Sequence, residues 1–169
     1  MPTISRLLVV TQGWRAIMKP GFSAITSSKY YHPSFNSAIF DGPIRIYFVQ
    51  FHETYALKIY FSVQERFKES LSHYKDIAKK TDQTVLVMIY PTEDSFQKAF
   101  NQESSLDYSF AKVIGKKDVV FGLLAPVIEN NVGQLMDELS DIFKIWEVKG
   151  LAEVMATDSN RSLASSDFI

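Results

Sequence analysis

The side chains best placed for chemistry follow the two most apolar strand-like runs of the sequence. His52 comes directly after the run 44–51, and Glu93 and Asp94 come shortly after the run 83–90. Ligands of open α/β sheets bind beyond the carboxyl ends of strands, so these three residues form a candidate ligand-binding site. A first helical turn also favours negative charge, which explains the two acids without any ligand. A small-ligand sensor or an enzyme with its site at the end of the central strand is therefore the alternative function.

Other kinds of chemistry find little support in the residue types. The sequence has no cysteine, which excludes a disulfide framework, a thiol nucleophile and thiolate metal ligands. Its three histidines, His32, His52 and His73, are too far apart to form a metal-binding pair on one helix. It contains no phosphate-binding glycine loop, no dinucleotide fingerprint and no nucleophile elbow. We predict no catalytic residue, no metal and no cofactor, and we lean against an enzyme.

The elements that would position these residues form a mixed pattern. Residues 44–51 and 55–61 alternate like strands, and Ser62 with Glu65 matches a capping box that would start a helix. The run 83–90 is typical of a strand buried on both faces, and a short helix follows it. A hairpin over 106–126 and a strongly periodic helix over 131–146 complete the body. The order ββαβ(α)ββα predicts an α+β fold with a mostly antiparallel sheet of about five strands.

One segment supports a second interpretation. Ala56, Tyr60, Val63, Phe67 and Leu71 also have helical spacing, so the helix could begin near residue 53 and replace the second strand. The order would then be βαβαββα, which is that of a thioredoxin-like α/β fold. Without cysteine such a fold could not perform dithiol chemistry.

Residues 1–42 form a basic head followed by an aromatic arm. Residues 3–19 have helical spacing, with Trp14 as an anchor, although a hairpin that uses residues 7–10 as a strand is an alternative. The arm after it is rich in rings, which either pack on the protein's own core or bind a partner. The candidate partner-contact residues are Trp14, Tyr30, Tyr31, Phe35 and Phe40.

The sequence divides into three parts by composition. The head and arm occupy residues 1–42, a single α+β domain occupies 43–150, and a polar tail occupies 151–169. Gly150 ends the periodic pattern of the last helix, and we expect the tail to be disordered in the isolated chain.

Charge and hydropathy exclude further classes of protein. The formal net charge is -1, which argues against a nucleic-acid-binding protein. No apolar run approaches the about 20 residues that a transmembrane helix needs, so we predict a soluble, cytoplasmic protein. Residues 1–40 carry four basic and no acidic residues, which also fits organelle targeting or peripheral membrane contact through residues 1–19.

The leading hypothesis combines these absences with the surplus of rings. We expect a non-catalytic protein–protein interaction or assembly subunit, which binds a protein partner or forms a homo-oligomer. The aromatic arm and the terminal segments would supply the contacts.

Overall fold

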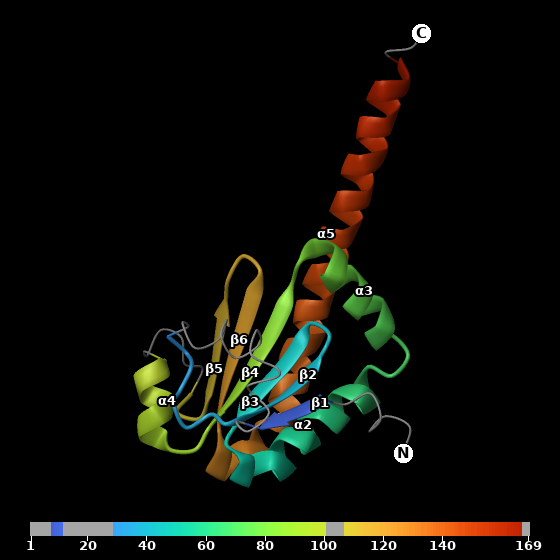
Figure 1. The fold of residues 1–169 in the computed structure, drawn as a ribbon. Coiled ribbons are helices and arrows are strands. Elements are labelled where there is room, and N and C mark those ends of the chain that lie inside the picture. The colour runs from blue at the N-terminus through green and yellow to red at the C-terminus, as the bar shows by residue number, and fades with distance from the viewer. Residues whose placement is uncertain (1–7, 12–28, 101–106, 167–169) are drawn as a thin grey trace.

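The computed structural model describes residues 8–11, 29–100 and 107–166 of this mixed α and β protein (Figure 1). The predicted α+β character is confirmed. Five strands lie within residues 37–124, and a further strand near the N-terminus joins the same sheet. In chain order the strands are β1 (Leu8–Thr11), β2 (Ser37–Asp41), β3 (Ile44–Phe48), β4 (Thr84–Tyr90), β5 (Phe110–Ile114) and β6 (Asp118–Leu124).

The sheet has the strand order β1-β2-β3-β4-β6-β5. Neighbouring strands run antiparallel at both sides of the sheet, but β3, β4 and β6 run parallel in its middle. The prediction of a mostly antiparallel sheet is therefore wrong at its centre. Parallel neighbours need crossover connections, and the helices between these strands provide them. Residues 83–90, predicted as the central strand, form β4 over Thr84–Tyr90.

The helices occupy one segment that was predicted to be a strand. They are α2 (Glu53–Arg66), α3 (Leu71–Thr81), α4 (Glu93–Ala99) and α5 (Val132–Ser166), with short 3-10 helices at Gln50–His52 and Ala125–Asn130. The strand predicted over 55–61 is wrong, because α2 covers it. Ala56, Ile59, Tyr60 and Val63 are the buried residues of α2, and their spacing is helical. The Ser62–Glu65 capping box is also wrong, since both residues lie inside α2.

The strand beside β3 comes from the predicted arm instead. β2 pairs with β3 in antiparallel register from Ser37↔Phe48 to Asp41↔Ile44. The turn between them is Gly42-Pro43, and Gly42 has φ +60, which glycine adopts readily at the first central position of a hairpin turn. The predicted division between residues 42 and 43 thus falls inside a hairpin. From β3 onward the order matches the alternative βαβαββα interpretation, with its first helix split into α2 and α3.

The N-terminal head is described only at β1. β1 pairs with β2 from Leu8↔Phe40 to Thr11↔Ser37, so the helix predicted over 3–19 is wrong at residues 8–11. The alternative hairpin, with residues 7–10 as its first strand, fits β1 better than the helix does. Its second strand and Trp14 lie outside the described residues.

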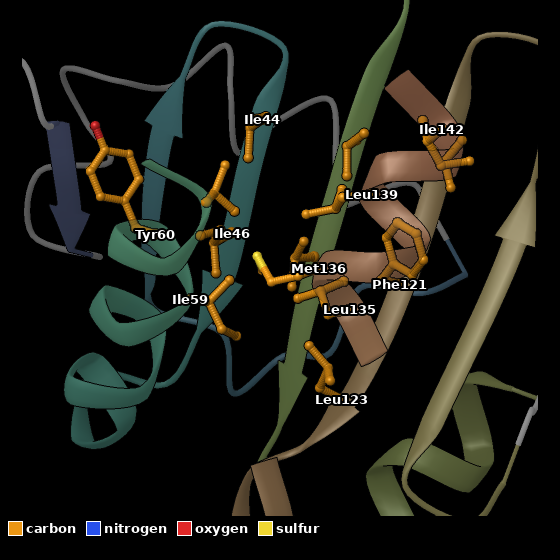
Figure 2. Packing of buried hydrophobic residues seen from close by; sticks show 14 of the residues in the cluster. Ile44, Ile46, Ile59, Tyr60, Phe121, Leu123, Leu135, Met136, Leu139 and Ile142 are labelled. Atoms are coloured by element: carbon orange, nitrogen blue, oxygen red, sulfur yellow. The ribbon is translucent and has the colours of Figure 1, made fainter. Parts of the chain in front are cut away.

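The sheet carries a hydrophobic cluster on each face. One cluster joins β3, β4 and β6 to α2, α3 and α5, and Figure 2 shows Leu135 and Met136 of α5 close to Ile46 of β3 and Leu123 of β6. The other cluster joins the opposite face to α4 and to the aromatic arm. The sheet is therefore covered by three helices on one face and by α4 with the arm on the other.

Helix α5 continues far beyond its expected end. Its 35 residues give a length of about 50 Å, and its C-terminal half projects out of the body (Figure 1). Gly150 does not end the helix, which is a correction to the sequence prediction. A Cβ at residue 150 would lie 3.1 Å from Ile77 Cγ2, so the glycine lets α5 pass close to α3. Residues 151–166, predicted as a disordered tail, are helical in the structure.

Candidate interaction surface

The second half of α5 carries apolar side chains that the body does not cover. Up to Trp146 the helix alternates between buried and exposed residues, but every residue from 151 to 156 is exposed. Four exposed apolar side chains in this half of the helix form what we call the α5 stripe: Val148 (66% exposed), Leu151 (60%), Val154 (58%) and Met155 (68%). Their spacing of three or four residues places them along one side of the helix. Ile145, 43% exposed, extends the apolar surface toward the body.

A groove lies beside the α5 stripe, between α3 and α5. Its volume is about 660 Å³, and Ile77, Gly150, Leu151 and Val154 give it apolar walls. Leu151 and Val154 thus belong both to the groove and to the stripe. The groove and the stripe form one continuous surface.

The rim of this groove carries the acids Asp76, Glu147 and Glu153 together with Lys80 and His73. His73 Nε2 lies 3.5 Å from Glu147 Oε1, and Lys80 Nζ lies 3.0 Å from Asp76 Oδ2. All four side chains are about half-exposed or more, so these pairs contribute little to stability. The rim therefore presents both signs of charge, with an excess of acidic residues.

Large apolar side chains elsewhere on the described surface are more scattered. Phe51 lies in the short 3-10 helix before α2. Tyr108 precedes β5, and Ile114 is the last residue of β5. Isolated exposed apolar residues are normal in soluble proteins, whereas contiguous patches mark interaction sites. The α5 stripe with its groove is the better candidate for a functional surface.

The three predicted ligand-binding residues lie at the same edge of the sheet but on opposite faces. His52 immediately precedes α2, whose buried side belongs to the cluster with α3 and α5. Glu93 and Asp94 open α4, which packs on the other face, and both acids are exposed. Asp94 forms an i,i+4 pair with Lys98 at 3.1 Å. Among the interactions of the described residues, none joins His52 to either acid.

His52 itself has an unusual environment. Its ring stacks on Tyr55 at 5.7 Å between centroids, and within the described part of the chain its buried Nδ1 has no hydrogen-bond partner. Burial lowers the pKa of this imidazole below its ordinary value, so the neutral form is favoured. A neutral imidazole could accept or donate one proton, but within the described residues no hydrogen bond joins it to Glu93 or Asp94.

The predicted partner-contact rings of the arm pack inward in this structure. Phe35 is 1% exposed and lies 5.2 Å from the ring of Tyr90, and Tyr30 stacks on Phe100 at 5.2 Å. The Tyr90 hydroxyl donates a hydrogen bond to the backbone carbonyl of Tyr30, which fastens the arm to β4. Tyr31 and Phe40 are partly buried against the same cluster, and Trp14 lies outside the described residues.

A polar network ties β2 to α2 and α3. Lys75 Nζ donates to Asp41 Oδ2 at 2.7 Å, and Gln64 Nε2 donates to the same oxygen at 3.1 Å. Burial, together with the nearby Asp41 carboxylate, raises the pKa of Tyr60 to about 12. Sequence inspection missed this network because its members are far apart in the chain. Its contacts are internal, so we assign it a structural role.

The described residues also bear on metal binding and on membrane insertion. In that part of the chain, no group of three or more His, Cys, Asp or Glu side chains could hold a metal ion. None of the helices described is long and apolar enough to cross a membrane.

Comparison of the chain with protein-family models, with curated proteins and with solved structures finds no match.

Proposed function

We propose that this chain is a non-catalytic protein–protein interaction subunit that binds its partner through the exposed half of α5 and the adjoining groove. The observation that carries the proposal is that one helix is built into the core as far as Trp146 and then presents apolar side chains to solvent. The groove walls of α3 continue this surface onto the body.

The energetics of an isolated helix support this proposal. A helical segment without tertiary contacts is marginal in water, because most helix stability in proteins comes from packing an apolar face. Each stripe residue is about two-thirds exposed, and fully burying such a side chain contributes about 1.5–3 kcal/mol. Covering the four residues would therefore contribute on the order of 4–8 kcal/mol, which is comparable to the cost of association.

The proposal is tested by site-specific photo-crosslinking in cells that express the full chain. A photoreactive amino acid replaces Val148 in the α5 stripe, and the matched control replaces Lys98 on α4, whose side chain is 74% exposed. We expect discrete crosslinked protein species from position 148 and none from position 98. Absence of such species at position 148, or the same species from both positions, would overturn the proposal.

A further inference from the structure

We infer that the partner on this surface is a second copy of the same chain, bound so that the two α5 helices run antiparallel about a two-fold axis near Leu151. This inference rests on the proposed function and names its partner. A two-fold interface uses the same patch on both copies, so the patch must be complementary to itself. Leu151 meets this requirement because it is both a wall of the groove and the middle of the apolar stripe.

The spacing of the stripe fits this arrangement. Val148 lies three residues before Leu151 and Met155 lies four residues after it, both on the same side of the stripe. In an antiparallel pair centred on Leu151, the position before the centre in one copy faces the position after the centre in the other. Leu151 then packs against its own copy, and Val148 packs against Met155 of the second chain. All three side chains are more than half exposed in the single chain, so each is available for this contact.

Charge favours a nearly neutral helix such as α5 over a strongly acidic occupant. Within residues 147–156 the charged residues are Glu147, Lys149 and Glu153, so this part of the helix is nearly neutral. The groove rim carries both signs of charge, with Asp76, Glu147 and Glu153 beside Lys80 and His73. A strongly acidic partner would meet several like charges on this rim, whereas a nearly neutral helix meets few.

Charge and shape also favour the antiparallel orientation over the parallel one. Lys144 is exposed and lies one helical turn before Val148, so a parallel pair would place two Lys144 ammonium groups side by side. The bodies of both copies would also lie at the same end of the helix pair. The antiparallel pair separates the lysines and places the bodies at opposite ends, as the projection of α5 allows (Figure 1).

The size of the contact indicates a reversible dimer. The 20 residues from 147 to 166 span about 30 Å of helix, and packed helices lie about 8–10 Å apart. One helix pair with the adjoining walls of α3 corresponds to the lower end of specific interfaces. We therefore expect dimerisation to depend on protein concentration.

Disulfide trapping tests the inference directly, because the natural chain contains no cysteine. Full-length Leu151→Cys should form a covalent dimer under mild oxidation much faster than the control Lys98→Cys. A mixture of Val148→Cys and Met155→Cys should couple as a heterodimer faster than either variant couples with itself. Equal rates for Leu151→Cys and Lys98→Cys would overturn the inference, and faster self-coupling of Val148→Cys would show a parallel pair instead.

Sedimentation equilibrium of the untagged full chain provides the second measurement. We expect a monomer–dimer equilibrium that Leu151→Glu shifts toward monomer by at least tenfold and that Lys98→Glu leaves unchanged. At concentrations where both chains are monomeric, the thermal transition of Leu151→Glu should match that of the natural chain, because residue 151 is mostly exposed in the monomer. A chain that is monomeric throughout but still crosslinks to another protein at position 148 contradicts the self-pairing and leaves the proposed function standing. A chain that does neither contradicts both.

Discussion

Replacing Gly122 by alanine gives the most direct quantitative test of this structure. Gly122 lies in β6, where it pairs with Met88 of β4 and Ala111 of β5. A Cβ at this position would lie 2.2 Å from Phe100 Cε2 and 2.6 Å from Phe100 Cζ. Carbon atoms in good contact are about 3.5–4.0 Å apart, so the Phe100 ring or the strand would have to move by more than 1 Å.

Neither the ring nor the strand can move at low cost. Hydrogen bonds to neighbours on both sides hold β6 in the sheet. Phe100 is 3% exposed, and its ring lies 5.2 Å from Tyr30, 5.6 Å from Tyr90 and 5.2 Å from Phe96. Overpacking of a filled core costs about 1–3 kcal/mol, and this overlap belongs at the upper end. Alanine restricts the unfolded chain and so returns about 0.4–1 kcal/mol, which leaves a net loss of about 2 kcal/mol.

A double-mutant cycle separates this overlap from other effects. Urea unfolding followed by far-UV circular dichroism would compare the natural chain, Gly122→Ala, Phe100→Ala and the double variant. Phe100→Ala alone should cost about 3–5 kcal/mol, because it removes a buried ring. In that background Gly122→Ala should cost nothing or stabilise slightly. A loss below about 0.5 kcal/mol for Gly122→Ala, or simple additivity of the two changes, would refute the packing of α4 and β6 described above.

Two further predictions concern the polar contacts. Asp41→Asn should lower the pKa of Tyr60 from about 12 toward the ordinary 10.0, as measured by ultraviolet titration of tyrosinate, because it removes the negative charge that helps to raise this pKa. The pKa of Tyr60 is higher in the folded chain than in the unfolded chain, so the contribution of Tyr60 to stability is complete below pH 10 and is lost as pH rises toward 12. Between pH 10 and 12, urea unfolding should show the free energy of unfolding falling more steeply for the natural chain than for Asp41→Asn. Thr92→Ala should cost about 1 kcal/mol in urea unfolding, because Thr92 Oγ1 accepts from the Ser95 backbone N–H at 3.1 Å at the start of α4. An unchanged urea midpoint for Thr92→Ala would contradict the capping explanation.

The parts of the fold that the sequence predicted are those whose patterns are local. The continuous apolar run 83–90 can be buried only as a central strand, and it forms β4. The hairpin around Gly115 and the start of α5 near Val132 follow from turn residues and from helical periodicity in the same way. In each case one arrangement satisfies the pattern without help from distant residues.

The errors lie where distant residues decide between local alternatives. Over 55–61 both periods fit, because Leu57, Ile59 and Phe61 alternate while Ala56, Tyr60 and Val63 have helical spacing. The choice depends on β2, whose pairing with β3 removes the need for a strand at 55–61. β2 itself is short and lies among serine and asparagine residues, so its strand character is visible only through its partner.

The sequence did not reveal the α5 stripe, because Gly150 predicts an end to the last helix. The same glycine explains why the stripe exists. Glycine after a periodic run usually marks the end of a helix, which placed residue 151 in a tail. In the structure a Cβ at residue 150 would lie 3.1 Å from Ile77 Cγ2, so the Ile77 side chain would have to move by a few tenths of an ångström. The glycine is therefore a contact between helices rather than an end. Because α5 passes this contact and remains helical, Leu151 and Val154 lie next to the walls of α3 instead of in an irregular segment. The helical spacing of Val148, Leu151 and Met155 was present in the sequence, and it becomes informative once Gly150 is understood as packing.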